Sequence, residues 1–162
     1  MIACLFSLSV AGQTVHVDSD RIAYRNTVKV DNTSQLELFF RAQKAIVDYV
    51  TQRPALIKTD AINNEMLAEG SITLSSPRYV TKTLLYTIKL SVHDGDYEYQ
   101  IDSVYLKQQE RRGSAKLTSS QELLKGMDVS GEASWIMEKQ LNEIDMNIQK
   151  LLALVNREMQ KT

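Results

Sequence analysis

The sequence predicts one α+β domain, an antiparallel sheet of four or five strands with two principal helices against one face. Three observations predict this class: a capped helical segment that begins near Ser34, an apolar hairpin around Asp94-Gly95, and a long amphipathic C-terminal segment. The chain has 162 residues, of which 43% are hydrophobic and 24% charged. These values are typical of one soluble globular domain, which we assign to residues 13–162.

The first strand and helix follow from two different periodicities. Apolar side chains at alternate positions predict a strand over residues 21–30, which Asp31-Asn32 ends. Ser34 and Glu37 have the spacing of a capping box, in which each side chain satisfies a backbone amide. The helix is expected to run until Pro54 stops it. Its apolar face is expected to contain Leu36, Phe39, Phe40, Val47 and Val50, with Ile46 beside them.

Two further strands and a hairpin are expected in the middle of the chain. Residues 56–59 and 65–74 read as strands, the second with Gly70 as a possible bulge. Residues 84–106 read as a hairpin, because Asp-Gly favours a two-residue turn in which both residues take positive φ. Folding about this turn pairs three apolar couples on one face: Val92 with Tyr97, Leu90 with Tyr99, and Ile88 with Ile101.

The C-terminal third is expected to contain a polar connection and the second main helix. Residues 107–120 are polar and read as a mobile loop or a fraying strand end, and residues 121–125 as a helical turn closed by Gly126. Ser130 is a plausible cap for the last helix. The four-three spacing of its apolar residues fits a coiled-coil seam or a helix on a sheet, and additional apolar residues outside the seam favour the sheet. The seam consists of Met137, Leu141, Ile144, Ile148, Leu151 and Val155.

The first twelve residues resemble the second half of a secretory signal peptide. They are apolar and uncharged, and Ser9 and Ala11 supply small residues before a possible cleavage site. We therefore expect an exported protein, periplasmic or at the cell surface; the alternative is a cytoplasmic protein in which this segment is a buried strand. Cys4 suggests a partial lipobox, but the apolar run continues beyond it, which argues against lipidation.

Composition argues against several classes of function. Nineteen basic and twenty acidic residues give a net charge of −1, so the chain lacks the basic excess of a nucleic-acid binder. One cysteine and two histidines do not supply the usual ligands of a structural zinc site. No stretch approaches the roughly 20 apolar residues that span a bilayer, so we do not expect an integral membrane protein.

The candidate sites are weak ones. The run from His93 to Asp96 is explained by turn chemistry and lacks the oxygen ligands of a calcium loop. Tyr97, Tyr99 and Tyr105 share one strand face by parity, where core packing is a better explanation than ligand stacking. No motif indicates a catalytic residue, a metal or a cofactor. The remaining candidate for a polar surface contact is a basic cluster of Lys107, Arg111, Arg112 and Lys116.

The hairpin also carries a resemblance. A strand of alternating apolar residues, an Asp94-Gly95 turn and an aromatic-x-aromatic strand at Tyr97 and Tyr99 resemble a family of exported bacterial domains of unknown function with a TBP-like fold. The stretch 67–72 looks like the preceding strand of that family, whereas His93 replaces the basic residue that is usual there. The resemblance implies a curved antiparallel sheet with helices on one side, and it implies no activity.

The function expected from these observations is a non-enzymatic envelope module that binds an unknown partner protein or ligand. Two alternatives remain open. The first is self-association through the seam of the C-terminal helix. The second is carriage of a small apolar ligand between sheet and helices, in a cavity lined by Phe39, Phe40 and Met137.

Overall fold

The computed structural model describes residues 16–18, 21–51, 53, 56–76, 80–110, 113–125 and 132–161. Several sequence predictions therefore lie outside the described residues: the signal segment 1–12, the helix stop at Pro54, the helix ends at Gly126 and Ser130, and the Arg111-Arg112 pair. The elements are β1 (His16–Asp18), β2 (Arg21–Lys29), α1 (Gln35–Ala45), the π-helical turn η1 (Ile46–Val50), β3 (Ile57–Asp60), β4 (Glu65–Leu74), β5 (Val80–His93), β6 (Asp96–Glu110), β7 (Ala115–Ser119), α2 (Ser120–Lys125) and α3 (Glu132–Met159).

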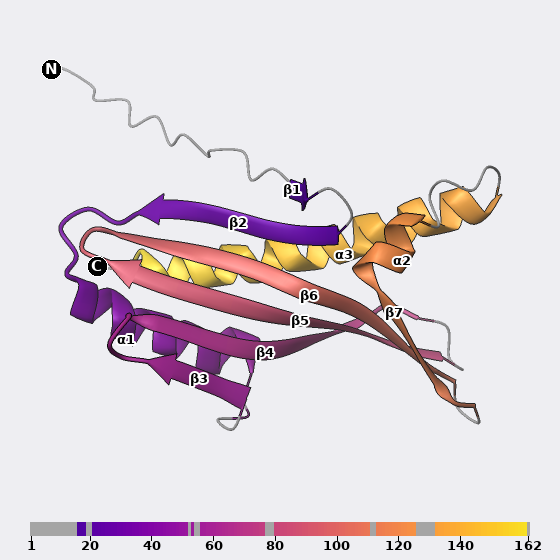
Figure 1. Cartoon of the computed structure of the whole chain (residues 1–162), viewed down its shortest axis with the longest axis horizontal. Coiled ribbons are helices and arrows are strands. Elements are labelled where there is room, and N and C mark those ends of the chain that lie inside the picture. Colours follow the sequence, from indigo (N-terminus) through magenta and orange to yellow (C-terminus); the bar gives the residue numbers. More distant parts are fainter. Residues whose placement is uncertain are drawn as a thin grey trace, which may run out of the picture.

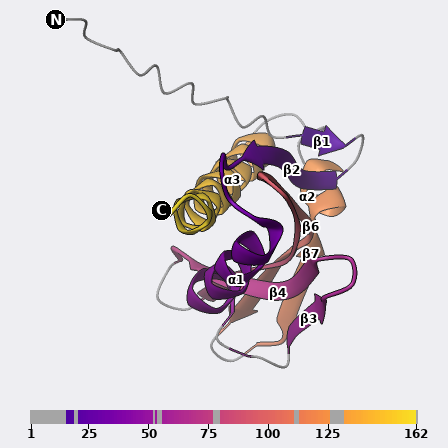
Figure 2. The same ribbon diagram turned by 90° about the vertical axis from the view of Figure 1, so that its left-hand side faces the viewer.

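The fold is the predicted α+β class, with one antiparallel sheet and the two main helices on the same side. The strand order is β1-β2-β6-β5-β4-β3, and β7 pairs with the second half of β6 (Figure 1). Seven strands are described, against the four or five expected, because β1 and β7 were not predicted. The sheet is curved, and α1 and α3 lie next to each other on its concave side (Figure 2).

The hairpin of β5 and β6 has the predicted register. Val92 pairs with Tyr97, Leu90 with Tyr99 and Ile88 with Ile101, and all six side chains are buried. Alternating apolar residues on both strands specify this register, because a slip by one residue would move every apolar side chain to the solvent face.

The turn of the hairpin differs from the expected type. Only Gly95 has positive φ, at 80°, whereas Asp94 does not, so the turn has the φ pattern of type II. Contacts with the start of α1 explain the difference. The Asp94 carboxylate accepts a hydrogen bond from the Gln35 amide at 2.8 Å, and the Gly95 amide donates to the Thr33 carbonyl at 3.0 Å. The turn therefore serves as a cap for α1.

A β-bulge interrupts β6 opposite Tyr86. Leu85 pairs with Tyr105 and Thr87 with Asp102, so two residues of β6 oppose one residue of β5. Ser103, in the bulge, has φ of 51°. The extra residue moves Tyr105 to the face opposite the buried Tyr99, which contradicts the expectation that these tyrosines share one face.

Of the two alternatives expected for residues 107–120, the mobile loop is wrong and the strand end is closer to the structure. β6 continues to Glu110, and β7 returns along it with Leu117 opposite Lys107. This second hairpin is polar because its side chains are largely exposed, so the sequence lacks the apolar alternation by which a half-buried strand is recognised.

The apolar face predicted for the first helix is right at Ile46 and Val50, which are buried, and at Phe39, which packs against the core, but it is wrong at the other three positions. Leu36 and Phe40 are 65% and 59% exposed, and Val47 in η1 is also exposed, whereas Leu38, Ala42 and Ala45 are fully buried. The small alanines face the layer between the sheet and α3, where the helix backbone approaches its neighbours closely. Ser34 caps α1 through Glu37 N at 3.3 Å, but the Glu37 carboxylate pairs with Arg41 and not with the helix start.

Candidate functional site

The second half of β4 is a free sheet edge among the described residues. β5 pairs with β4 from Glu65 to Leu74, but β3 pairs with it only from Glu65 to Ala68. Figure 1 shows β3 as a short arrow beside the first part of β4. Residues 69–74 therefore have no described strand on their outer side.

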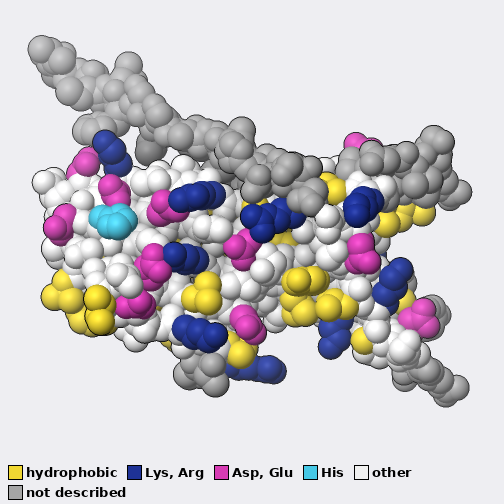
Figure 3. All heavy atoms as spheres, in the orientation of Figure 1, with side chains coloured by type: hydrophobic (Ala, Val, Ile, Leu, Met, Phe, Trp, Pro, Cys, Tyr) yellow, Lys and Arg dark blue, Asp and Glu magenta, His cyan; other side chains and the backbone are white. Residues whose placement is uncertain are grey.

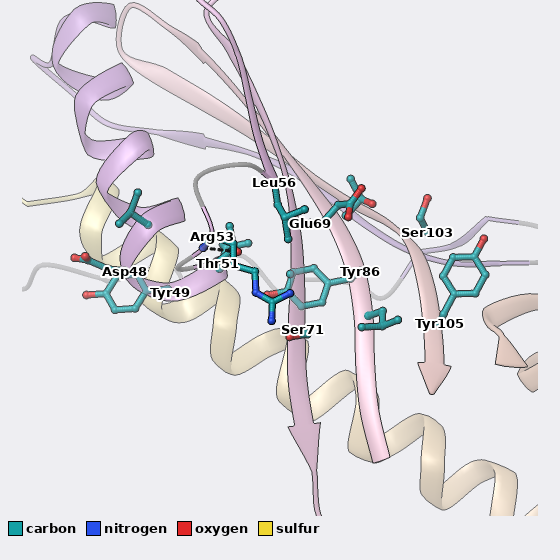
Figure 4. A pocket seen from close by; sticks show the side chains of 15 residues that line it. Asp48, Tyr49, Thr51, Arg53, Leu56, Glu69, Ser71, Tyr86, Ser103 and Tyr105 are labelled. Carbon is teal, nitrogen blue, oxygen red and sulfur yellow. Dashed lines mark hydrogen bonds between the residues drawn. The ribbon is translucent and has the colours of Figure 1, made fainter. Parts of the chain in front are cut away.

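A groove lies at this free edge, and we call it the edge groove. It is an open cavity of about 750 Å³ between the end of η1 and the sheet (Figure 4). Its lining comprises residues 47–51, Arg53, Leu56, residues 69–71 of β4, residues 85–87 of β5, and Ser103 and Tyr105 of β6. The groove thus combines residues of the helical side with residues of the opposite face of the sheet.

Tyr86 and Gly70 form the floor of the groove. They are directly opposite each other in the β4–β5 register, and a Cβ on Gly70 would overlap the Cζ and hydroxyl oxygen of Tyr86. Gly70 is therefore required for the ring of Tyr86 to lie across β4. The pairing is regular at Gly70, so the bulge that the sequence suggested there is absent.

The Tyr86 hydroxyl is a buried polar group without a partner. The residue is 3% exposed, and its oxygen makes no hydrogen bond to any residue that the structure describes. Burial raises the pKa of this phenol, so the hydroxyl is neutral at physiological pH and available as a hydrogen-bond donor. A buried donor without an acceptor is unusual in a folded protein, and an ordered water or a ligand atom would satisfy it.

One charged side chain, that of the exposed Arg53, extends toward the ring of Tyr86 (Figure 4). Its guanidinium has no hydrogen bond or ion pair within the described part of the chain, and neither does the Glu69 carboxylate; Asp48, in contrast, pairs with Lys44. The arrangement can hold a polar ligand by a neutral donor and an unpaired cation.

The face of the sheet away from α3 carries exposed apolar side chains near the groove. Leu67, Tyr105 and Leu117 are 37%, 39% and 55% exposed. Figure 3 shows this face, on which hydrophobic groups are interspersed with Lys, Arg, Asp and Glu side chains. Tyr105 belongs both to this face and to the edge groove.

The predicted basic cluster is not brought together where the structure describes it. Lys107 of β6 pairs with Leu117 of β7, so Lys107 and Lys116 point to opposite faces of the hairpin. Lys116 instead lines a smaller cavity with Lys82 and Glu110. Arg111 and Arg112 are outside the described residues.

The predicted helix interface faces the domain's own sheet. Ile144, Ile148 and Val155 are fully buried, Leu151 is 5% exposed, and Met137 and Leu141 pack against the same core. The apolar residues that α3 leaves exposed are others: Trp135, Ile136 and Met146. Phe39, Phe40 and Met137, suggested as a ligand cavity, do not line the edge groove.

The other candidate residues have structural roles. Asp94 caps α1, and Tyr97 and Tyr99 belong to the core. Within the described ranges, no group of three or more His, Cys, Asp or Glu side chains is arranged to hold a metal ion. No helix in the same ranges is long and apolar enough to cross a membrane.

Sequence reasoning missed the edge groove, although one part of it left a signal. A glycine inside an otherwise regular strand indicates a bulge or the close approach of another group, and Gly70 was interpreted as the first of these. The approaching group, Tyr86, is identified only by the pairing of β4 with β5, which has no short turn to set its register. Arg53 left no signal, because it lies between elements.

The sequence and the fold can be compared with those of known proteins. A crystal structure of a TBP-like protein from Parabacteroides distasonis superposes with a TM-score of 0.72 and 13% identity, covering 91% of this chain and 98% of that one. A DUF4468 family protein from Bacteroides ovatus gives a TM-score of 0.66 at 12% identity, covering 94% and 93%. No curated protein matches the chain. The family model described as a domain of unknown function (DUF4468) with TBP-like fold matches residues 24–107, just over half of the sequence, and the chain therefore belongs to the DUF4468 family.

Proposed function

We propose that this protein is a non-enzymatic binding module of the bacterial envelope, and that it holds its ligand in the edge groove. One observation carries the proposal: the buried hydroxyl of Tyr86, which has no partner among the described residues, lies at the floor of an open cavity of about 750 Å³. Ligand pockets commonly combine apolar walls with a few polar groups that fix orientation. Here Val47, Val50 and Leu56 supply apolar surface, and Tyr86 and Arg53 supply polar groups.

The location in the envelope is supported by the sequence. Residues 1–12 are apolar, uncharged and end in small residues, which resembles the second half of a signal peptide. Fractionation of the producing cells, followed by mass analysis of the protein's N-terminus, tests this part. A chain that starts near Gly12 or Gln13 in an envelope fraction is expected, whereas an intact Met1 in the cytoplasm contradicts export.

Binding is tested by NMR titration of the isotope-labelled protein with three ligand classes: peptides, oligosaccharides and fatty acids. At least one class is expected to shift the backbone amides of residues 69–71 and 85–87. Ser71→Arg places a long side chain at the groove and should remove that effect. Thr27→Arg, on the exposed surface of β2, is the matched control and should retain it. If no class shifts the groove amides, the proposal is wrong.

A further inference from the structure

We infer that the edge groove receives an extended peptide, which adds to the sheet as a strand beside residues 69–74 of β4. The inference rests on the proposed function and names its ligand class. It further specifies that the peptide carries an acidic side chain on the helical side of the sheet and apolar side chains on the opposite side. Addition of a strand to an exposed sheet edge is a general mode of peptide recognition, in which backbone hydrogen bonds provide affinity and pockets for alternate side chains provide specificity.

The hydrogen-bonding pattern of β4 shows which backbone groups are free. The Val92 amide donates to the Asn64 carbonyl at 3.0 Å, so the even-numbered residues of this ladder exchange hydrogen bonds with β5. The odd-numbered residues Glu69, Ser71 and Thr73 therefore direct their N–H and C=O groups outward. The run of free backbone groups ends at Ser75, because its amide donates to the Glu143 carboxylate at 3.0 Å.

The shape of the groove fits a strand better than a compact ligand. A strand projects successive side chains to opposite faces, and the groove is lined from both faces of the sheet. On the helical side it is bounded by η1, Arg53 and Tyr86, and on the other side by Leu85 and Tyr105. The six residues 69–74 extend about 20 Å at the usual strand rise, which accommodates a segment of about six residues.

The chemistry of the two sides specifies the peptide. On the helical side, Tyr86 offers a neutral buried donor and Arg53 an unpaired guanidinium, which together complement a carboxylate. On the opposite side, the Glu69 carboxylate of β4 has no partner among the described residues and would repel a second acid. The exposed Tyr105 and half-buried Leu85 of the same lining are apolar, so an uncharged apolar side chain fits this side. A peptide in which acidic and apolar residues alternate matches both sides of the groove. In a fixed register, every second side chain of the peptide lies on the same face of the sheet.

The test uses a six-residue peptide, acetylated and amidated, that alternates valine with aspartate. NMR titration of the full chain is expected to show shifts in residues 69–74 and saturable binding. Ser71→Pro removes an outward N–H that the β4–β5 ladder does not use, and it should weaken binding at least about tenfold. Ser71→Ala keeps that N–H and is the matched control, expected to bind within about twofold of the wild type.

Two peptide variants separate strand addition from other binding. Methylation of alternate backbone nitrogens on the edge-facing side of the peptide should abolish binding, and replacement of aspartate by lysine should weaken it at least about tenfold. Tyr86→Phe should also weaken binding, although it removes an unpartnered buried group from the free protein. These measurements do not depend on whether Ser71→Pro folds.

The outcomes distinguish this inference from the proposed function. Equal binding of methylated and unmethylated peptides would overturn strand addition and leave the binding function standing. Strand addition would also be overturned, and the binding function left standing, by a second outcome. In it, an oligosaccharide or fatty acid shifts the groove amides, whereas neither the valine–aspartate nor the valine–lysine peptide shifts them at about 5 mM. If no ligand class shifts the groove, both the inference and the proposed function are wrong.

Discussion

The position of Tyr86 over β4 lowers the stability of the folded protein, because no described neighbour hydrogen-bonds its hydroxyl. Its ring covers Gly70, and its hydroxyl is removed from water without gaining a partner among the described residues. An unsatisfied buried donor costs about 1–3 kcal/mol. A hydroxyl that lowers the stability of the free protein is consistent with the ligand contact proposed above.

We predict that Tyr86→Phe stabilises the ligand-free protein by about 1 kcal/mol, because it removes the unpaired hydroxyl and retains the ring. Tyr24→Phe is the matched control. The Tyr24 hydroxyl donates to Asp145 at 3.2 Å, so its loss should destabilise the protein by about 1 kcal/mol. Urea denaturation measures both. Equal destabilisation in the two variants would show that the Tyr86 hydroxyl has a partner in the free protein.

Ser103 is a second residue whose conformation carries a cost. It lies in the bulge with φ of 51°, a region that costs a residue with a side chain about 1–2 kcal/mol and glycine almost nothing. We predict that Ser103→Gly stabilises the protein by about 0.5–1 kcal/mol, measured by thermal or urea unfolding. Ser91→Gly, in the regular part of β5, should instead destabilise it by about 0.5–1 kcal/mol. A loss of stability in Ser103→Gly would contradict the strained conformation.

The orientation of α1 can be tested at the scale of the element. Leu38 is fully buried between α1 and the sheet, whereas Phe40 is 59% exposed. We predict that Leu38→Ala costs about 2–5 kcal/mol and Phe40→Ala less than about 0.5 kcal/mol in urea denaturation. The sequence pattern predicted Phe40 on the buried face. A larger loss of stability in Phe40→Ala than in Leu38→Ala would support that orientation of α1 and contradict the structure.

The elements also show where sequence reasoning succeeds. The β5–β6 hairpin was predicted with its register because alternation on both strands and a two-residue loop each specify the same pairing. The buried face of α1 was predicted only in part, because Ala42 and Ala45 give little hydrophobic signal, although their size decides which face approaches the sheet. Seam residues of α3 were identified, and the apolar residues outside the seam already favoured the domain's own sheet as their partner, which the burial of the seam confirms.

The bulge in β6 left a signal that was not used. Buried apolar residues occupy odd positions up to Ile101 and even positions from Val104 onward. A change of parity within one strand indicates one extra residue. The edge groove left no comparable pattern, because it depends on β3 being shorter than β4 and on a cross-strand contact between Gly70 and Tyr86.

At the scale of the whole molecule, polar contacts fix α3 to the sheet along much of its length. Asp145 accepts from Tyr24 of β2, Asn156 from Tyr97 of β6, and Glu143 from the amide that follows β4. At its end, the Met159 carbonyl accepts from Arg41 of α1 at 2.8 Å. These contacts specify one orientation of the helix, so the apolar seam faces inward and the long helix is part of the single core.

A buried carboxylate beside this last attachment, that of Glu158, makes the stability of the protein depend on pH. Glu158 is 2% exposed near the end of α3, where Lys161 hydrogen-bonds its carboxylate, Lys44 lies at 3.8 Å, and the Tyr49 hydroxyl at 3.5 Å. The hydrogen bond from Lys161 is the main cause that lowers the pKa of Glu158 from its ordinary value of 4.5. A carboxyl whose pKa is lower in the folded protein stabilises it above the ordinary value, and this contribution is lost as pH falls through the lowered pKa.

We therefore predict that the unfolding temperature of the wild type falls more steeply below pH 4.5 than that of Glu158→Gln, which has no carboxyl to protonate. Part of the acid dependence should remain in that variant, because hydrogen bonds also lower the pKa of Asp60 and of Glu122. Glu138→Gln, at an exposed position of α3, is the matched control and should follow the wild type. The measurement is calorimetry between pH 3 and 7, a range that covers the ordinary pKa of carboxyl groups. Parallel curves for the wild type and Glu158→Gln would mean that the charge of Glu158 does not hold the end of α3 against α1.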